Sequence, residues 1–246
     1  GGSTIYQDDD IFKINNETSN VWLKNQIEKL KKIPNLKIKI RTSVAAFHGY
    51  NYLLARENLT DHLGVNERKE KIRQRLLKIR AKKVVIATGA IERPLIFSNN
   101  DRPGIILSSS IKKYIDYYGV KTGENISLFT NNDSAYETAI SLNKSGVKIK
   151  VIIDIRENSN SILSEKIEKA GIKILRGYTI TNTDGYKRIN SIDVMKLSKD
   201  GGSVVGNKTT YKCDCLGVSG GWTPMVHLFT QSGGKLKFKN NDNVFI

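Results

Sequence analysis

The chain has few residues suited to metal or thiol chemistry: its only cysteines are Cys213 and Cys215, and it has three histidines, His48, His62 and His227. Structural zinc sites need four ligands, usually in two short-spaced pairs, so no metal site is predicted. Without a CxxC pair, a disulfide reductase would have no thiols with which to react. Since the two cysteines lie two residues apart in an expected strand, we expect both buried thiols on the same face.

Long apolar runs are also absent. The run Val151-Ile152-Ile153 is typical of the longest, far short of the ~20 residues that a membrane-spanning helix needs. No signal peptide is visible, and the low cysteine usage suits a reducing compartment. We therefore expect a cytoplasmic protein without a membrane interaction. With 246 residues, of which 39% are hydrophobic, the chain suits one large or two ordinary globular domains.

Acidic residues are scarce as well: 24 Asp and Glu stand against 40 Lys and Arg, a formal charge of +16. Such an excess raises the possibility of nucleic-acid binding. The lysines, however, are spread through every segment and are not interleaved with aromatic residues, and the dense groups at 29–32 and 68–71 are typical of solvated faces. We therefore predict no nucleic-acid partner. A basic face suits an acidic subunit or an anionic cofactor better.

What the chain does contain, in its middle, is an alternation of strands and helices. This pattern predicts a βαβαβ unit with a parallel sheet and hence an α/β fold. A capped helix from Ser108 to Gly119 precedes the unit, and antiparallel strands follow it. The unit itself comprises strands at 126–129, 147–153 and 172–175 and helices at 134–144 and 161–170.

The first part of the chain is expected to be mixed. A helix begins after Thr18-Ser19-Asn20, whose side chains are good helix caps. Residues 36–40 alternate as a half-buried strand, and residues 42–79 predict a small antiparallel meander. Val84-Val85-Ile86 then reads as a parallel strand covered on both faces.

Two expected strands end in small residues, one at Thr88-Gly89-Ala90 and the other, after the strand at 213–218, at Ser219-Gly220-Gly221. The carboxyl ends of strands in open α/β sheets are where nucleotides bind. Arg93 brings a cation to the first of these loops, although a solvated arginine after a plain turn explains it equally well. We expect both ends to line one crevice, which implies one nucleotide-binding domain interrupted by another.

The inserted unit lacks the usual phosphate-binding turn. The dinucleotide fingerprint uses glycines for a tight turn and for close approach of the backbone to pyrophosphate. Here Thr130, Asn132 and Ala135 stand at the glycine positions, and Asp133 adds a negative charge at the helix N-terminus, where we expect it to act as the cap. Asp154 lies where a ribose-binding acid would stand, but it also fits a strand-end turn former. These features argue against ordinary dinucleotide binding by this unit.

No catalytic constellation is visible. His227 could act as an acid or base, but its place after Pro224 is also that of an ordinary helix-start residue. No nucleophile, base and orienting group occur at recognisable spacing. We therefore predict no catalytic residue and expect a part that holds a cofactor.

Several strings resemble the α subunits of heterotetrameric sarcosine oxidases. They are ATGAIERP (87–94), SNNDRPGI (98–105), TNNDSAYETA (130–139) and VSGGWTPMVHLFTQSGGKL (218–236), with NYL (51–53) and TDHL (60–63) in addition. The α-type subunits of other amine- and amino-acid-oxidising complexes share part of this pattern. The resemblance therefore covers almost the whole chain and points to the superfamily more firmly than to the substrate.

The resemblance implies a glutathione-reductase-like flavoprotein fold with two dinucleotide-binding domains. A Rossmann-like domain at 104–211 would be inserted into an FAD/NAD-binding-type domain at 1–103 and 212–246, incomplete at both ends. In the family, sarcosine is demethylated oxidatively to glycine, with peroxide and a one-carbon unit on tetrahydrofolate as products. The α subunit holds NAD, FAD or FMN lies in the β subunit or at its interface, and β, γ and δ subunits complete the complex.

The resemblance also implies which residues lie near NAD. The chain departs from the family pattern in lacking its first GxGxxG turn and ribose-binding acid, and in having Ile91 at an expected histidine. Since it starts at a glycine without methionine, we expect a piece of a longer protein, inactive and weak in NAD binding by itself. The implied NAD-binding residues are Gly1, Gly2, Val44, Thr88, Gly89, Ala90, Arg93, Gly220 and Gly221.

Two alternatives remain open from the sequence. The first is a stand-alone FAD/NAD(P)-dependent oxidoreductase of the pyridine nucleotide-disulfide superfamily that lacks the redox CxxC. It would need an intact phosphate turn and a redox group, and neither is visible. The second is a basic interaction module without a cofactor.

Overall fold

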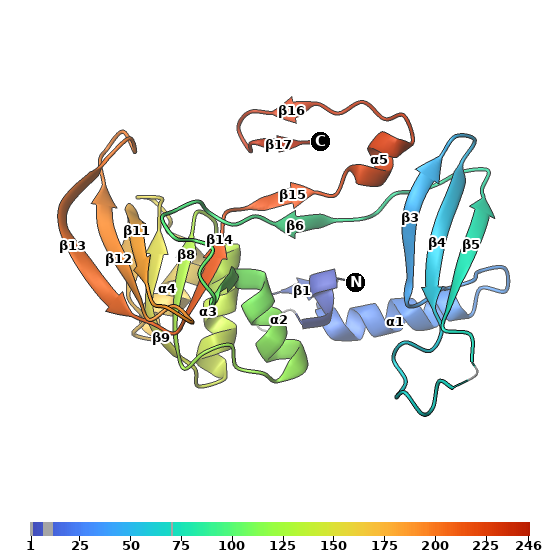
Figure 1. The fold of residues 1–246 in the computed structure, drawn as a ribbon, viewed down its shortest axis with the longest axis horizontal. Helices are drawn as coiled ribbons and strands as arrows, with labels where there is room; N and C mark the ends of the chain where they lie inside the picture. Colours follow the sequence, from blue (N-terminus) through green and yellow to red (C-terminus); the bar gives the residue numbers. More distant parts are fainter. Residues whose placement is uncertain (1, 7–11, 70) are drawn as a thin grey trace. The chain divides into compact units, whose positions relative to one another are not determined.

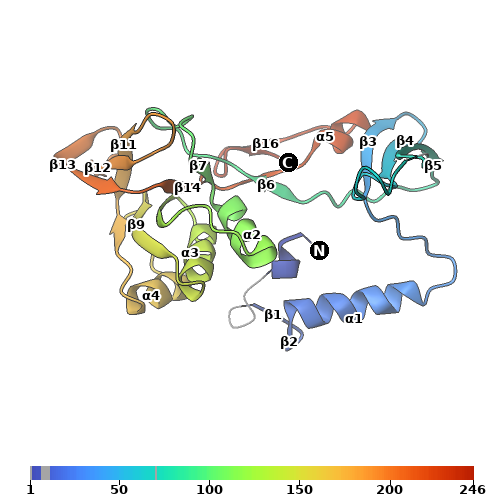
Figure 2. The ribbon, with the colours of Figure 1, turned by 60° about the horizontal axis from the view of Figure 1, so that its bottom comes forward.

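The computed structural model describes residues 2–6, 12–69 and 71–246 (Figures 1 and 2). The chain forms two compact units, each built from two stretches of sequence. The division into an FAD/NAD-binding-type domain and an inserted Rossmann-like domain, at 103/104 and 211/212, stays a prediction. Unit 1 comprises Gly1–Leu23 and Glu92–Trp222, and unit 2 comprises Lys24–Ile91 and Thr223–Ile246.

Unit 1 is built on a five-stranded sheet with the strand order β10-β9-β8-β14-β7. Every neighbouring pair in this sheet is parallel, as the βαβαβ pattern predicts. Ser219 at the end of β14 lies opposite Thr130 at the end of β8. Two carboxyl ends that are distant in sequence therefore meet at one edge. The strands are β7 (Ile105–Leu107), β8 (Asn125–Thr130), β9 (Lys148–Asp154), β10 (Ile174–Arg176) and β14 (Cys215–Ser219).

Three helices pack on one face of this sheet: α2 (Ser108–Tyr118), α3 (Ser134–Lys144) and α4 (Ile162–Lys169). Helix α2 ends as predicted at Gly119, whose φ of 64° is left-handed and favours glycine. Helix α4 begins with a capping box in which Ser161 accepts a hydrogen bond from the Ser164 amide. These local signals fix the helix ends before any packing is considered.

The opposite face of the sheet carries an antiparallel meander of β11 (Tyr178–Asp184), β12 (Ser191–Leu197) and β13 (Val204–Lys212). Figure 2 shows these strands on one side of the sheet and α3 and α4 on the other. Since both faces are covered, successive residues of β8 and β9 enter different cores.

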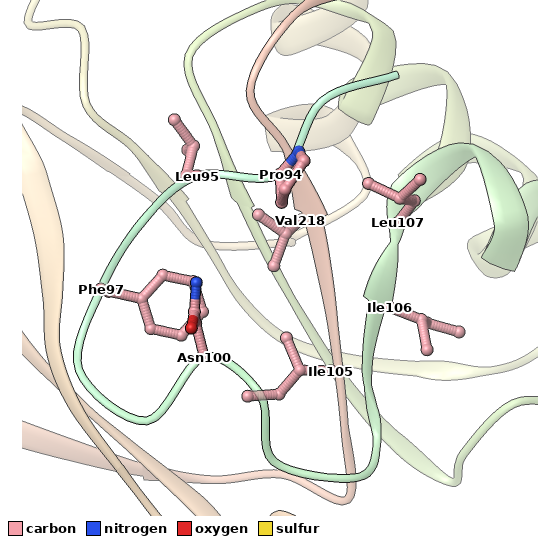
Figure 3. Close-up of a pocket in the computed structure, with 8 residues that line it drawn as sticks. All are labelled: Pro94, Leu95, Phe97, Asn100, Ile105, Ile106, Leu107 and Val218. Atoms are coloured by element: carbon pink, nitrogen blue, oxygen red, sulfur yellow. The ribbon is translucent and has the colours of Figure 1, made fainter. Parts of the chain in front are cut away.

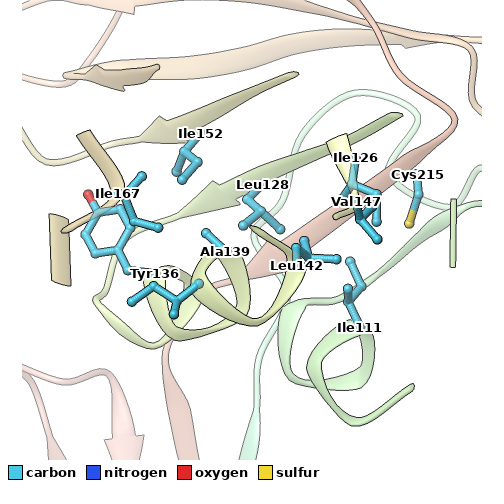
Figure 4. Close-up of a cluster of buried hydrophobic side chains, with 11 residues drawn as sticks. Ile111, Ile126, Leu128, Tyr136, Ala139, Leu142, Val147, Ile152, Ile167 and Cys215 are labelled. Carbon is cyan, nitrogen blue, oxygen red and sulfur yellow. The ribbon is translucent and has the colours of Figure 1, made fainter. Parts of the chain in front are cut away.

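Two hydrophobic clusters follow from this layering. Leu128 and Ile152 point to the helices, as Figure 4 shows, whereas Phe129, Val151 and Ile153 pack towards the meander. All five side chains are at most 1% exposed. The unbroken β-branched run at 151–153 is therefore explained by burial of both faces.

The two cysteines do not share a face, contrary to the prediction. A bend at Asp214 separates β13 from β14, so Cys213 packs with Phe129 in the meander-side cluster, and Cys215 packs with Leu128 on the helix side. The prediction assumed one continuous strand, and the bend removes the two-residue periodicity. Both thiols are free and buried.

Unit 2 contains the predicted antiparallel meander, with the order β3-β4-β5. The amide of Phe47 donates to Oε1 of Gln231 at 2.8 Å, which ties the meander to α5. Its elements are β3 (Thr42–His48), β4 (Tyr52–Asn58), β5 (Gln74–Arg80) and α5 (His227–Gln231). The remaining elements of the chain are η1 (Gly2–Tyr6), β1 (Lys13–Ile14), β2 (Glu17–Thr18), α1 (Ser19–Lys31), β6 (Ala90–Glu92), β15 (Trp222–Pro224), β16 (Phe238–Lys239) and β17 (Val244–Phe245).

Two expected strands are absent from the described residues. Residues 36–40 and 84–86 have no strand assignment, and Ile40 and Val85 are 67% and 91% exposed. A strand needs a neighbour to accept and donate its backbone hydrogen bonds, and no described strand pairs with either segment. The apolar pattern of these two segments was therefore not sufficient to predict a strand.

No helix of the described residues combines the length and apolar character needed to cross a bilayer.

We expect Leu128→Ala to lower the free energy of unfolding of unit 1 by about 2–5 kcal/mol, because it opens a cavity in a fully packed cluster. Ile162→Ala on α4 is the control: Ile162 is 85% exposed, and its truncation should change stability by no more than about 0.5 kcal/mol. Guanidinium unfolding followed by circular dichroism measures both. Equal effects of the two substitutions would contradict the layered core.

We also expect both thiols to resist alkylation in the folded protein. Burial raises the pKa of Cys213 to about 11 and also raises that of Cys215, so at about pH 8 both remain protonated and unreactive. Iodoacetamide followed by peptide mass spectrometry should label neither thiol until guanidinium unfolds the chain. Rapid labelling of Cys213 in the folded protein would contradict this packing.

Candidate functional site

A close backbone approach in unit 1 joins Gly220 to Arg93. The Gly220 amide donates to the Arg93 carbonyl at 2.6 Å, and the Arg93 amide donates to the Gly221 carbonyl at 2.8 Å. A Cβ on Gly220 would lie 2.5 Å from the carbonyl oxygen of Pro94, which leaves no room for a side chain. Gly221 has a φ of +97°, which also favours glycine. The glycine pair is therefore required by the contact with the 93–94 backbone.

A second contact, within unit 2, holds Thr88 and Gly89 against Met225. The Thr88 Oγ1 donates to the Met225 carbonyl at 2.7 Å, and the Met225 amide donates to the Gly89 carbonyl at 2.9 Å. Gly89 has a φ of +71°, and no atom lies within 4 Å of where its Cβ would be. Thr88, Gly89 and Ala90 are exposed, so another molecule has access to their backbone.

The remaining implied NAD-binding residues lie in other elements. Val44 pairs with Ala55 in the meander of unit 2 and is 41% exposed. Gly2 begins η1 in unit 1 and is exposed. Gly1 lies outside the described residues. A part for these residues in nucleotide binding stays a prediction, as it does for the segments at 88–93 and 220–221.

The turn between β8 and α3 is filled by side chains of the chain itself. Asn132 Oδ1 accepts a hydrogen bond from the Ser134 amide at 3.0 Å, and Asn132 Nδ2 donates to Ser219 Oγ at 3.0 Å. The indole of Trp222 donates to Ser134 Oγ at 3.2 Å. An amide side chain thus fills the turn at a position where the dinucleotide fingerprint has a glycine. Asp133 stands at the N-cap position of α3, as expected, but its side chain makes no capping hydrogen bond, and Asn132 supplies the acceptor instead.

Asp133 instead binds Arg156, which sequence reasoning missed. Arg156 Nη2 lies 2.7 Å from Asp133 Oδ1 and 2.7 Å from Asp154 Oδ2, and the Tyr136 hydroxyl donates to Asp154 at 2.6 Å. The hydrogen bonds that Arg156 donates to Asp154 raise the pKa of Arg156, and burial raises that of Tyr136, so the guanidinium stays charged and the phenol neutral. Asp154 is fully buried in this network, which leaves its carboxylate no access to a ribose. The only sequence feature that could have indicated this ion pair is that Arg156 follows Asp154 by two residues.

This turn therefore does not fit a dinucleotide in the ordinary way. His227 begins α5 and is exposed. The described residues contain no group of three or more His, Cys, Asp or Glu side chains arranged to hold a metal ion.

An apolar cavity of about 230 Å³, which the sequence did not reveal, adjoins the Gly220 contact (Figure 3). Pro94 forms part of its wall, and its side chains come from the 94–100 loop, from β7 and from β14. The residues that line it are Pro94, Leu95, Phe97, Asn100, Ile105, Ile106, Leu107 and Val218.

No protein-family model matches the chain. Among curated proteins it is similar to three sequences named sarcosine oxidase subunit alpha. Identity is 36% over 206 residues with that of Corynebacterium sp. strain U-96, 32% over 236 residues with that of Corynebacterium sp. strain P-1, and 30% over 235 residues with that of Rhizobium meliloti strain 1021. These alignments cover 84%, 95% and 96% of this chain but only 21%, 24% and 22% of those proteins. The chain thus spans between a fifth and a quarter of the length of these relatives.

Solved structures share the fold. L-proline dehydrogenase from P. horikoshii superposes with a TM-score of 0.66 at 21% identity, covering 100% of this chain and 39% of that one. Thioredoxin reductase from T. acidophilum also gives a TM-score of 0.66, at 17% identity, covering 96% of this chain and 71% of that one. At these identities the likeness concerns the fold alone, and it confirms the predicted α/β class.

The sequence strings, the three alignments and the fold agree: over the part of those subunits that it spans, the chain belongs to the family of sarcosine oxidase α subunits.

Proposed function

We propose that the chain is the nucleotide-holding part of the α subunit of a sarcosine oxidase. The observation that carries the proposal is identity of 30–36% over 84–96% of the chain with three sequences of that name. The complete protein would oxidise sarcosine to glycine, with peroxide and a tetrahydrofolate-bound one-carbon unit as further products. The substrate and products follow from the family resemblance.

The nucleotide we propose is NAD, held by the small-residue segment at 88–90 and by Arg93. An exposed backbone without bulky side chains lets a pyrophosphate approach, and a guanidinium forms charge-assisted hydrogen bonds with phosphate oxygens. Gly220 and Gly221 support this proposal because their hydrogen bonds fix the backbone of Arg93. A nicotinamide dinucleotide supplies hydride-transfer chemistry when it is bound.

The chain's own residues are proposed to bind and to orient, and the oxidation itself is assigned elsewhere. We place FAD or FMN in the β subunit or at its interface, with γ and δ subunits completing the complex in the cytoplasm. The free thiols of Cys213 and Cys215 support a reducing compartment. A net charge of +16 supports docking against acidic partner surfaces.

Purified at its natural length with its partner subunits, the protein should release peroxide and glycine when sarcosine is added. A matched assay with NADH or NADPH and no sarcosine tests the alternative, a stand-alone reductase. Peroxide formation that depends on sarcosine supports the proposal. Consumption of the reduced nucleotide without any response to sarcosine would contradict it.

Replacing Arg93 by glutamine should weaken NAD binding about 10–100-fold, because a charge-assisted hydrogen bond to phosphate contributes about 1.5–3 kcal/mol. Lys113→Gln on α2 removes a cation of the same unit that the proposal does not use, and it should leave the dissociation constant unchanged. Isothermal titration calorimetry on the natural protein measures both. Equal affinities of the Arg93 variant and the unmodified protein would place the nucleotide elsewhere.

A further inference from the structure

Asn132 is the centre of a hydrogen-bond network between two strand ends of unit 1. Its Nδ2 donates to Ser219 Oγ at 3.0 Å and to the Ser219 carbonyl at 3.3 Å. Its Oδ1 accepts from the Ser134 amide at 3.0 Å and from the Ser134 hydroxyl. One side chain thus caps α3 and holds the end of β14.

The end of β14 leads directly into the glycine pair. Next to Asn132, the Asn131 amide donates to the Ser219 carbonyl at 3.2 Å, and the Asn131 side chain donates to the Gly220 carbonyl at 3.4 Å. Gly220 itself donates to Arg93 at 2.6 Å. The chain of contacts therefore runs from the β8–α3 turn through Ser219 to the backbone of Arg93.

The chemistry of the side chain explains why an amide occupies this position. An amide offers an acceptor for the α3 amide and two N–H donors for the hydroxyl and carbonyl of Ser219, whereas a hydroxyl side chain has a single donor. Aspartate would keep the acceptor and lose the donors, alanine would lose both, and glycine would reopen the turn. Because Ser219 and Gly220 are fully or nearly fully buried, water does not readily replace these bonds.

We propose that Asn132 is a positioning residue: through Ser219 and Gly220 it fixes the Arg93 loop in the geometry that receives the nucleotide. The proposal rests on the proposed function for its ligand. The turn that holds a phosphate in ordinary dinucleotide-binding units here holds the adjacent glycine pair instead. The inserted unit therefore serves the nucleotide through its structure and makes no contact with it.

The test uses Asn132→Ala and Asn132→Asp in the natural protein. Hydrogen exchange measures the amides of Arg93 and Gly220, and calorimetry measures the affinity for NAD. Loss of hydrogen bonds worth about 1 kcal/mol each should accelerate exchange of these amides about 5–10-fold and weaken NAD binding by a similar factor. The aspartate variant keeps the acceptor for the Ser134 amide but loses both donors to Ser219, so it should also show faster exchange.

Ser161→Ala is the matched control. It removes the cap of α4 and so destabilises the same unit without changing any hydrogen bond of the β8–α3 turn. It should leave exchange at Arg93 and Gly220 and the affinity for NAD unchanged. A purely structural role of Asn132 would make the alanine variants of Asn132 and Ser161 indistinguishable in both readouts.

The outcomes separate the two proposals. Unmodified protein that binds no NAD overturns the proposed function, and hydrogen exchange alone then decides on the positioning role. Binding that is unchanged in both Asn132 variants, with unchanged exchange, overturns the positioning role and leaves the proposed function intact. Tighter binding of NAD after Asn132→Ala would show that the β8–α3 turn itself receives the phosphate. That result would also overturn the positioning role.

Discussion

The contact between Gly220 and the Arg93–Pro94 backbone is the constraint on which the candidate site depends. A hydrogen bond of 2.6 Å and a Cβ position 2.5 Å from a carbonyl oxygen leave a single residue type that fits. This close approach connects two segments more than 120 residues apart in the chain. It also positions the only cation of the implied NAD-binding set, because Arg93 lies at the point where the backbones meet.

The β8–α3 turn keeps the strand, turn and helix of a dinucleotide-binding unit, but its polar groups bind one another. The helix N-terminus still needs an acceptor, and the Asn132 amide supplies it from within the chain. The expected ribose-binding position still carries an acid, but Asp154 is buried and forms an ion pair with Arg156. Such self-satisfied polar groups stabilise the fold, and their desolvation makes displacement by an incoming phosphate costly.

Sequence reasoning succeeded where local signals or two-sided burial dictate the result, as in the βαβαβ unit and in the helix that ends at Gly119. It failed where a strand needs a partner from elsewhere: residues 36–40 and 84–86 have the right pattern, but no strand among the described residues pairs with them. It also failed at Cys213 and Cys215, because a bend at one residue reverses the face on which the next side chain lies.

The sequence alone determined the fold class, the order of the elements in the βαβαβ unit and the family, because hydrophobic period, caps and motif strings are properties of short stretches. Only the tertiary structure decided that Gly220 contacts Arg93, that the side chain of Asn132 rather than Asp133 accepts from the first turn of α3, and that Asp154 pairs with Arg156. Each of these depends on which residues distant in sequence share a buried edge of the sheet. Parallel strand register and side-chain burial define that edge, and neither can be predicted from a single segment of the sequence.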